Sequence, residues 1–172
     1  MNELGKQTVE SFLDAVAEAS PAPGGGTSAG VAVALAAGLV EMTARFANGE
    51  AGEQARELRT RALELAEKEL TSYAPVLTAD TGAERKAALV AASEPPARIA
   101  ETAAEVAELG LSVAATSSES LRGDALTGVV LAEAAAAAAA RLVWINLGSS
   151  EPHERAHAAA RRAAAARLAA PR

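Results

Sequence analysis

The chain has 172 residues, of which half are hydrophobic but only 2% aromatic, and its formal net charge is -6. A chain of this length can bury one core, so we expect a single domain over residues 1–172. The acidic balance argues against binding to a nucleic-acid backbone. Without cysteine, disulfides and thiolate chemistry are excluded, which fits a reducing compartment.

More than a quarter of the residues are alanine, the strongest helix former, and β-branched or aromatic runs are scarce. This composition predicts an all-α fold. Glycine, proline, asparagine and serine divide the chain into helical segments, which gives a bundle of about seven helices. In chain order we expect helices over residues 5–19, 27–47, 50–76, 83–92, 97–113 and 124–147, and a last one from Glu151, with breaks at Asn48-Gly49, at Pro95-Pro96 and in the Ser-rich segment 116–120.

Two of these segments, 27–47 and 124–147, are rich in alanine and apolar on nearly every face, so we place both in the centre of the bundle. The segment 50–76 is amphipathic and is predicted to cover the core. The longest apolar run, from Ala29 to Val40, is too short to span a membrane, and the first residues do not resemble a signal peptide. We therefore expect a cytoplasmic protein with no membrane partner.

The segment Ser-Pro-Ala-Pro-Gly-Gly-Gly-Thr-Ser over residues 20–28 is the most unusual in the chain. Three consecutive glycines indicate special backbone geometry or close approach of a ligand. With Thr27 or Ser28 as N-cap, free amides at the helix start would face a carboxylate or a flat polar ring. The alternative is a flexible linker. The segment lacks the lysine and spacing of a nucleotide-binding loop.

The run His153-Glu154-Arg155-Ala156-His157 matches the pattern of zinc metallopeptidases. Those enzymes take a third ligand from downstream, whereas no His, Asp or Glu follows His157. We therefore predict no metal site here and interpret the segment as a solvated terminal helix, whose arginines complement the helix dipole.

Three carboxylates have sequence positions that predict a specific role for each. Glu41 is four residues from Arg45 in an apolar helix, which predicts an ion pair. Glu69 adjoins the apolar face of the charged helix, so partial burial would raise its pKa and make it a plausible general acid or base. Asp124 follows a glycine at the predicted start of a helix, where N-capping is its default role.

Several motifs together resemble the cyclodeaminase/cyclohydrolase family, which includes the cyclodeaminase half of formiminotransferase-cyclodeaminase and methenyltetrahydrofolate cyclohydrolases. They are Phe-Leu-Asp-Ala-Val over 12–16, the proline- and glycine-rich segment over 20–29, Met42 with Arg45, and Trp-Ile-Asn-Leu over 144–147. The segment 65–73 resembles a family helix whose Asp is the proposed acid/base, replaced here by Glu69. The chain also departs from the family pattern at Gly123 and Leu142, where the family has Ser and Asn.

The resemblance implies an all-α homodimer that converts one-carbon units of tetrahydrofolate without a metal or other cofactor. It would cyclise 5-formiminotetrahydrofolate to 5,10-methenyltetrahydrofolate with loss of ammonia, or hydrolyse 5,10-methenyltetrahydrofolate to 10-formyltetrahydrofolate. Glu69 would be catalytic, and the folate would contact Pro23, Gly24, Gly25, Gly26, Asp124 and Asn146. The alternative is a non-catalytic helical binding or assembly protein with the same fold.

The core also predicts that a second chain associates with this one. A monomer with so few large side chains can bury little apolar area, and a partner would complete the burial. We expect an isologous dimer whose seam uses the two central helices, with Val31, Leu35, Leu131 and Trp144 supplying contact area.

Overall fold

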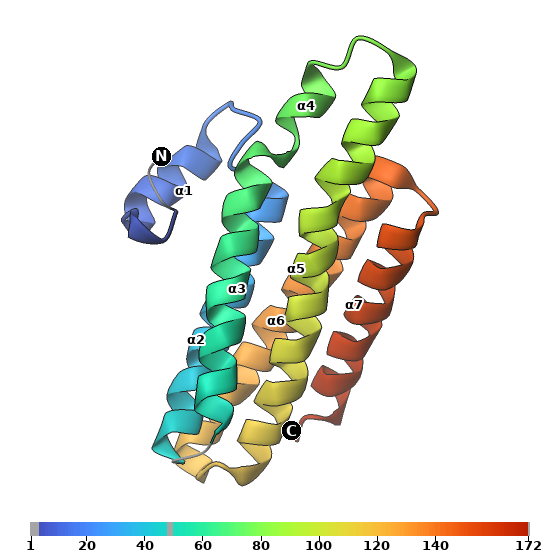
Figure 1. Cartoon of the computed structure of the whole chain (residues 1–172). Helices are drawn as coiled ribbons and strands as arrows, with labels where there is room; N and C mark the ends of the chain where they lie inside the picture. Colours follow the sequence, from blue (N-terminus) through green and yellow to red (C-terminus); the bar gives the residue numbers. More distant parts are fainter. Residues whose placement is uncertain (1–3, 48–49, 172) are drawn as a thin grey trace.

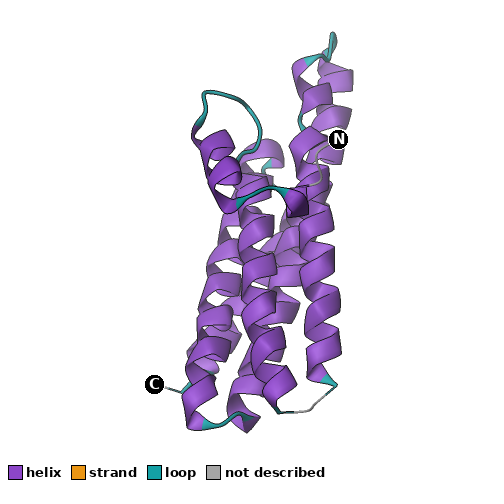
Figure 2. Cartoon of the chain, turned by 90° about the vertical axis from the view of Figure 1, so that its left-hand side faces the viewer, coloured by secondary structure: helices purple, strands orange, loops and turns teal. Residues whose placement is uncertain are grey.

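The computed structural model describes residues 4–47 and 50–171, and in that part of the chain all regular structure is helical (Figures 1 and 2). The all-α prediction is confirmed. The break expected at Asn48-Gly49 lies outside the described residues. The elements are a short 3-10 helix η1 (Leu4–Lys6), then α1 (Val9–Ala17), α2 (Gly25–Phe46), α3 (Ala51–Ser72), α4 (Ala74–Leu77), α5 (Gly82–Thr116), α6 (Glu119–Leu147) and α7 (Glu151–Ala169).

Four long helices, α2, α3, α5 and α6, run side by side, and α7 packs against α5 and α6 (Figure 1). The helix α1 sits apart, beside the end of the bundle where α2 begins (Figure 1). The predicted central helices α2 and α6 contact each other along the bundle, and α5 is buried to a similar extent. The amphipathic α3 covers them with one face, as its sequence pattern predicts.

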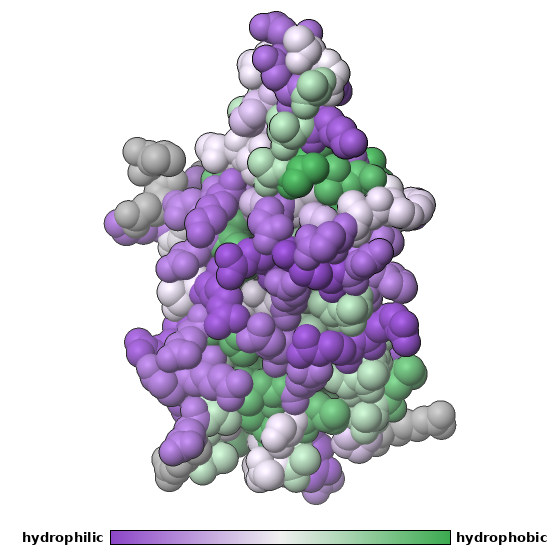
Figure 3. Space-filling model, turned by 45° about the vertical axis from the view of Figure 1, so that its right-hand side comes forward, coloured by the Kyte–Doolittle hydropathy of each residue, from purple (hydrophilic) through white to green (hydrophobic). Residues whose placement is uncertain are grey.

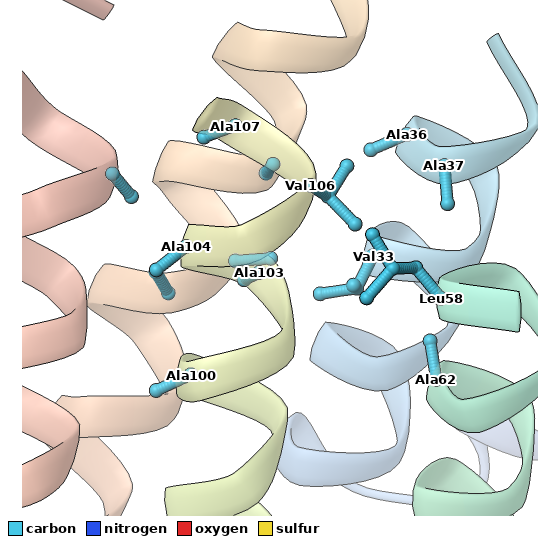
Figure 4. Close-up of a cluster of buried hydrophobic side chains, with 14 of the residues drawn as sticks. Val33, Ala36, Ala37, Leu58, Ala62, Ala100, Ala103, Ala104, Val106 and Ala107 are labelled. Atoms are coloured by element: carbon cyan, nitrogen blue, oxygen red, sulfur yellow. The ribbon is translucent and has the colours of Figure 1, made fainter. Parts of the chain in front are cut away.

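Alanine and valine make most of the core, with Leu58 and Ile99 as its largest fully buried members (Figure 4). Such small side chains bring helix backbones close together. Two glycines mark close approaches around α6: a Cβ at Gly128 would lie 2.9 Å from the carbonyl oxygen of Ala36, and one at Gly110 would lie 2.9 Å from a methyl of Val129. The packing contacts of the bundle therefore come mainly from helix backbones that lie close together, and less from large side chains.

Charged side chains cover the side of the molecule on which α7 lies, where Figure 3 shows a mainly hydrophilic surface. Arg155 donates to both carboxylate oxygens of Glu94, at 2.8 and 2.9 Å, and Arg162 pairs with Glu108. These contacts tie α7 to α5 in addition to the dipole effect that the sequence suggested for the arginines.

Several helix boundaries differ from the sequence prediction, and three of the differences change how the segments divide or where Asp124 lies. The segments 83–92 and 97–113 form one helix, α5, which runs through Pro95 and Pro96. Each proline removes one backbone donor, but Pro96 is fully buried and packing against neighbouring helices holds α5 together. The helix α6 begins at Glu119, so Asp124 lies inside it and is not an N-cap. The residues expected in one helix over 50–76 divide at Tyr73 into α3 and α4.

Two helices, α2 and α6, are long and apolar enough to cross a membrane by length and composition alone. In this structure both are core helices of a bundle, and core helices often meet the same criterion of length and apolar composition. In α2, 61% of the apolar window is buried within the fold, and in α6 the share is 44%. The remaining exposed part of α6 is one edge that faces away from the bundle.

Candidate functional site

A pocket of about 290 Å³ opens at the end of the bundle where α2 begins and where α3 and α6 end. Three separate segments of the chain form it, together with the single turn α4. Its lining residues are Pro21, Ala22, Gly24, Gly25, Gly26, Thr27, Glu69, Leu70, Tyr73, Ala74, Leu77, Leu142 and Asn146. The structure thus brings Glu69, the three glycines and Asn146 into one pocket, although they are far apart in sequence.

The proline- and glycine-rich segment forms one wall of the pocket and continues directly into α2. Its turn includes a hydrogen bond from the Ser20 hydroxyl to the carbonyl of Ala22, and the bond before Pro23 is cis. Gly24 is the N-cap, so α2 begins three or four residues earlier than a cap at Thr27 or Ser28 implies. Pro23 itself does not line the pocket. The amides of the first turn have no partners within the helix and lie beside the pocket.

Glu69 lies on the last turn of α3 and points at the first turn of α2. A Cβ at Gly26 would overlap its carboxylate, so only glycine leaves room for Glu69 there. One turn along, a Cβ at Gly30 would lie 2.7 Å from the Cβ of Ala66, so α2 and α3 also approach closely at that point. Gly30 therefore sets the distance between the two helices, whereas Gly26 leaves space for the flexible Glu69 side chain against the start of α2.

Burial raises the pKa of Glu69 above its ordinary value, and a hydrogen bond from the Ser72 hydroxyl opposes part of that rise. The hydroxyl donates to Oε2 of Glu69 at 2.7 Å. A carboxyl group with a raised pKa exchanges a proton closer to neutral pH than an exposed one. The geometry therefore gives Glu69 the properties of a proton donor and acceptor.

Thr27 is a pocket residue that the sequence analysis interpreted only as a helix cap. Its side chain is 1% exposed, and Oγ1 has no hydrogen-bond partner among the described residues. A buried hydroxyl without a partner is costly, so it is a group that a bound ligand could satisfy. Its position directly after the glycines was the only sequence signal for this role.

The far wall of the pocket comes from the end of α6. Asn146 and Leu142 are one turn apart on it, and both line the pocket. Tyr73, at the end of α3, forms part of the rim and is 38% exposed. The neighbouring Trp144 points elsewhere, since its ring lies 4.9 Å from that of His153 on α7.

Asp124 is not part of this pocket. It lies on α6, 22 residues before Asn146, which corresponds to about 33 Å along a helix. Within one chain, the structure therefore places Asp124 near the opposite end of the bundle from Glu69. This differs from the arrangement expected from the resemblance, in which both residues contact the same folate.

The two histidines line a second hollow with Arg141 and Trp144. The rings of His153 and His157 lie 5.7 Å apart in a stacked arrangement. Among residues 4–47 and 50–171, no three His, Asp or Glu side chains are grouped as a metal site requires. The predicted Glu41 pair is present: the carboxylate binds Arg45 at 2.7 Å and Arg59 of α3 at 2.8 Å.

The chain is thus an all-α helical-bundle domain with a pocket at one end. That pocket combines a half-buried carboxyl group, a glycine-lined helix start and an asparagine. The family model described as formiminotransferase-cyclodeaminase matches residues 8–165. The chain belongs to this family, as the sequence motifs indicate.

Two comparisons with individual proteins agree with that assignment. Formiminotetrahydrofolate cyclodeaminase from Thermotoga maritima superposes with a TM-score of 0.81, over 96% of this chain and 98% of that one, at 23% sequence identity. The methenyltetrahydrofolate cyclohydrolase of Methylorubrum extorquens is 41% identical over 46 residues. That match covers 27% of this chain and 22% of the relative, so the chain spans about a fifth of that protein's length.

Proposed function

We propose that this protein acts on a one-carbon derivative of tetrahydrofolate, by cyclodeaminase or cyclohydrolase chemistry, with Glu69 as its general acid/base. The observation that carries the proposal is the half-buried Glu69 carboxyl group, with its raised pKa, in the wall of a pocket. Membership of the family supports it, as do the names of the two relatives.

The pocket suits part of a folate. Ligand pockets commonly have volumes of about 300–1,000 Å³, so a cavity near the lower limit accommodates a ring system while the rest of the ligand extends outside. Leu70, Leu77 and Leu142 supply apolar walls for a flat ring. The Thr27 hydroxyl, the amide of Asn146 and the first amides of α2 supply polar contacts for its edges.

The cyclodeaminase reaction requires that one proton be relayed from the attacking amine to the departing nitrogen. The second folate amine attacks the formimino carbon, a new carbon–nitrogen bond forms, and that amine loses its proton. The formimino nitrogen starts in its protonated (amidinium) form and takes this proton through the carboxyl group, so its bond to carbon breaks as ammonia leaves and the methenyl product keeps the positive charge. One carboxyl group of raised pKa can accept the proton and return it, which is the role proposed for Glu69.

The cyclohydrolase reaction uses the same group differently. Water adds to the methenyl carbon and loses one proton to a base. The bond from this carbon to N5 then breaks while the remaining hydroxyl proton passes to N5, which leaves the formyl group on N10. In both reactions the nucleophile is the substrate's own amine or water, so the proposal includes no metal or other cofactor.

Turnover is tested spectrophotometrically at the methenyl absorbance, with 5-formiminotetrahydrofolate and 5,10-methenyltetrahydrofolate in separate assays. We expect one of the two to be converted, and Glu69→Gln to lower kcat by about a hundredfold or more. Glu69→Asp, which carries the residue of the related helix, should keep part of the activity. The matched control is Glu64→Gln, which removes an exposed carboxylate from the same helix.

Folded protein that converts neither folate would exclude the enzymatic proposal. If it still bound tetrahydrofolate, and Glu69→Gln did not change the affinity, the non-catalytic alternative would hold. Circular dichroism of each variant distinguishes loss of the site from loss of the fold.

A further inference from the structure

The hollow that the two histidines line lies between α6 and α7, which pack side by side (Figure 1). Its volume is about 300 Å³. Three alanines line it, and their methyl groups are too short to fill the space between the helices at this point. The other lining residues carry a ring or a positive charge. We call this cavity the α6–α7 hollow and define it by Arg141, Trp144, His153 and His157.

Three aromatic rings of the hollow lie next to one another. The ring of His153 is 4.9 Å from that of Trp144 and 5.7 Å from that of His157. The two histidines are four residues apart, so both rings are on one face of α7. Trp144 is 42% exposed, which leaves part of the indole free to contact a ligand. Aromatic rings pack well against other flat rings, so this group suits an aromatic ligand.

Arg141 gives the hollow a positive charge that is not neutralised. Among residues 4–47 and 50–171 its guanidinium makes neither a hydrogen bond nor an ion pair. By contrast, Arg155, Arg162 and Arg167 of α7 each pair with a carboxylate. No acidic side chain is among the described residues that line the hollow. Arginine keeps its charge in proteins, so the hollow has a cation whose anionic partner a ligand could supply.

The α6–α7 hollow and the Glu69 pocket use different sides of α6. Leu142 and Asn146 line the pocket, whereas Arg141 and Trp144 line the hollow. Successive residues are about 100° apart around a helix, so Trp144 and Asn146 are separated by about 160°. The hollow is therefore not an extension of the Glu69 pocket, and a ligand can occupy it while the pocket is empty.

We propose that the α6–α7 hollow is a second binding site, for a small planar aromatic ligand that carries a carboxylate. The ring of the ligand packs against Trp144 and His153 over the alanines. Its carboxylate accepts hydrogen bonds from the guanidinium of Arg141, whose planar group matches both oxygens. The ring of His157 continues the aromatic wall. The proposal does not rest on the proposed function, because no residue of the Glu69 pocket takes part in it.

Trp144 is the only tryptophan in the sequence, so tryptophan fluorescence reports on this hollow directly. Benzoate is titrated into the protein, with benzamide as its neutral analogue and acetate as an anion without a ring. We expect benzoate to change the emission in a saturable way and to bind at least about tenfold more tightly than either analogue. Arg141→Gln should weaken benzoate binding by about tenfold or more. The matched control is Arg98→Gln, which removes an exposed arginine of α5 that does not line the hollow.

An emission change without saturation, equal affinities for benzoate and either analogue, or equal losses in Arg141→Gln and Arg98→Gln would overturn the proposal. Thr27→Val changes the Glu69 pocket and should leave the benzoate affinity unaltered. A loss of affinity in that variant would place benzoate in the Glu69 pocket, which also overturns the proposal. Circular dichroism confirms the fold of each variant. The titrations contain no folate, so failure of the proposed function would leave these results unaffected.

Discussion

The carboxylate of Glu69 occupies the space in which a side chain at Gly26 would lie. The two residues are on different helices, and their fit places a proton-exchanging group against the start of α2. The glycine run therefore has a steric role that is independent of any ligand contact. Substitution at either residue should affect both the local packing and the proposed chemistry.

Gly26→Ala should displace the Glu69 carboxylate and lower the turnover rate. Because the displaced atoms are the far end of a flexible side chain, the free energy of unfolding should change little. The turnover assay and urea unfolding measure the two effects. Gly123→Ala is the control, because an added Cβ there meets no atom within 4 Å and alanine favours helix, so stability should rise. Equal effects of the two substitutions would contradict the steric role of Gly26.

The stability of the protein should depend on the protonation of Glu69. Because burial raises its pKa in the folded chain, the native state binds this proton more tightly than the unfolded state. The free energy of unfolding therefore falls as pH rises from about 4.3, the ordinary pKa of glutamate, to the raised native value. Glu69→Gln does not titrate, so its stability relative to wild type should increase across that window.

Urea unfolding of wild type and Glu69→Gln over a series of pH values measures this difference. Glu64→Gln controls for loss of a charge from α3 and should run parallel to the wild type. A difference between wild type and Glu69→Gln that is independent of pH would show that Glu69 ionises equally in both states.

Glu41 links α2 to α3 through Arg59, and its side chain is 8% exposed. Glu41→Gln should weaken this charged hydrogen bond and reduce the free energy of unfolding by about 1–3 kcal/mol. Glu53→Gln removes the partner of Arg56 in an exposed pair, which solvent screens, and should change stability much less. Similar losses in both variants would mean that burial adds nothing to the Glu41 pair.

The two histidines of α7 should not bind zinc with a folding role. His153 contacts the ring of Trp144, and the described residues supply no third ligand. We expect metal analysis of purified protein to find far less than one zinc per chain, and the thermal midpoint to be unchanged by chelator or by His157→Ala. One equivalent of zinc that is lost in the His157→Ala variant would contradict this.

The exposed edge of α6 offers a test of the dimer seam that the sequence predicts. Ala138 is exposed there, whereas Ala135 is 4% exposed and belongs to the core. Ala138→Arg should raise the dimer dissociation constant at least about tenfold and keep the fold, while Ala135→Arg should unfold the chain. Light scattering and circular dichroism separate the two results. Ala158→Arg, on the exposed side of α7, should remain dimeric.

Composition predicted the fold because alanine has the highest helix propensity, so its abundance indicated helices. The helices α2 and α6 are apolar on nearly every face, which indicated that they lie inside the bundle. By local rules Pro95 and Pro96 indicate a helix break, but tertiary contacts hold α5 together along its 35 residues. Local rules predict helix ends poorly when packing energy exceeds the loss of two hydrogen bonds.

The candidate site was only partly predictable. Glu69 adjoins the apolar face of its helix, so helical periodicity and the family resemblance pointed to the same residue. Thr27 was missed because its burial depends on α3 and on the early start of α2 at Gly25, which no local signal shows. Asp124 was grouped with the pocket through the family resemblance alone, although a single helix over 124–147 already places it about 33 Å from Asn146 along the helix.

The alanine-rich core has a consequence for how this domain can change. Alanine has no side-chain rotamers, so the interior cannot reshape itself around a new ligand by repacking. Adaptation to another substrate is then confined to the few larger side chains at the pocket rim, such as Tyr73, Leu77 and Leu142. The bundle acts as a fixed frame, and variation in specificity among homologous domains should concentrate at its end.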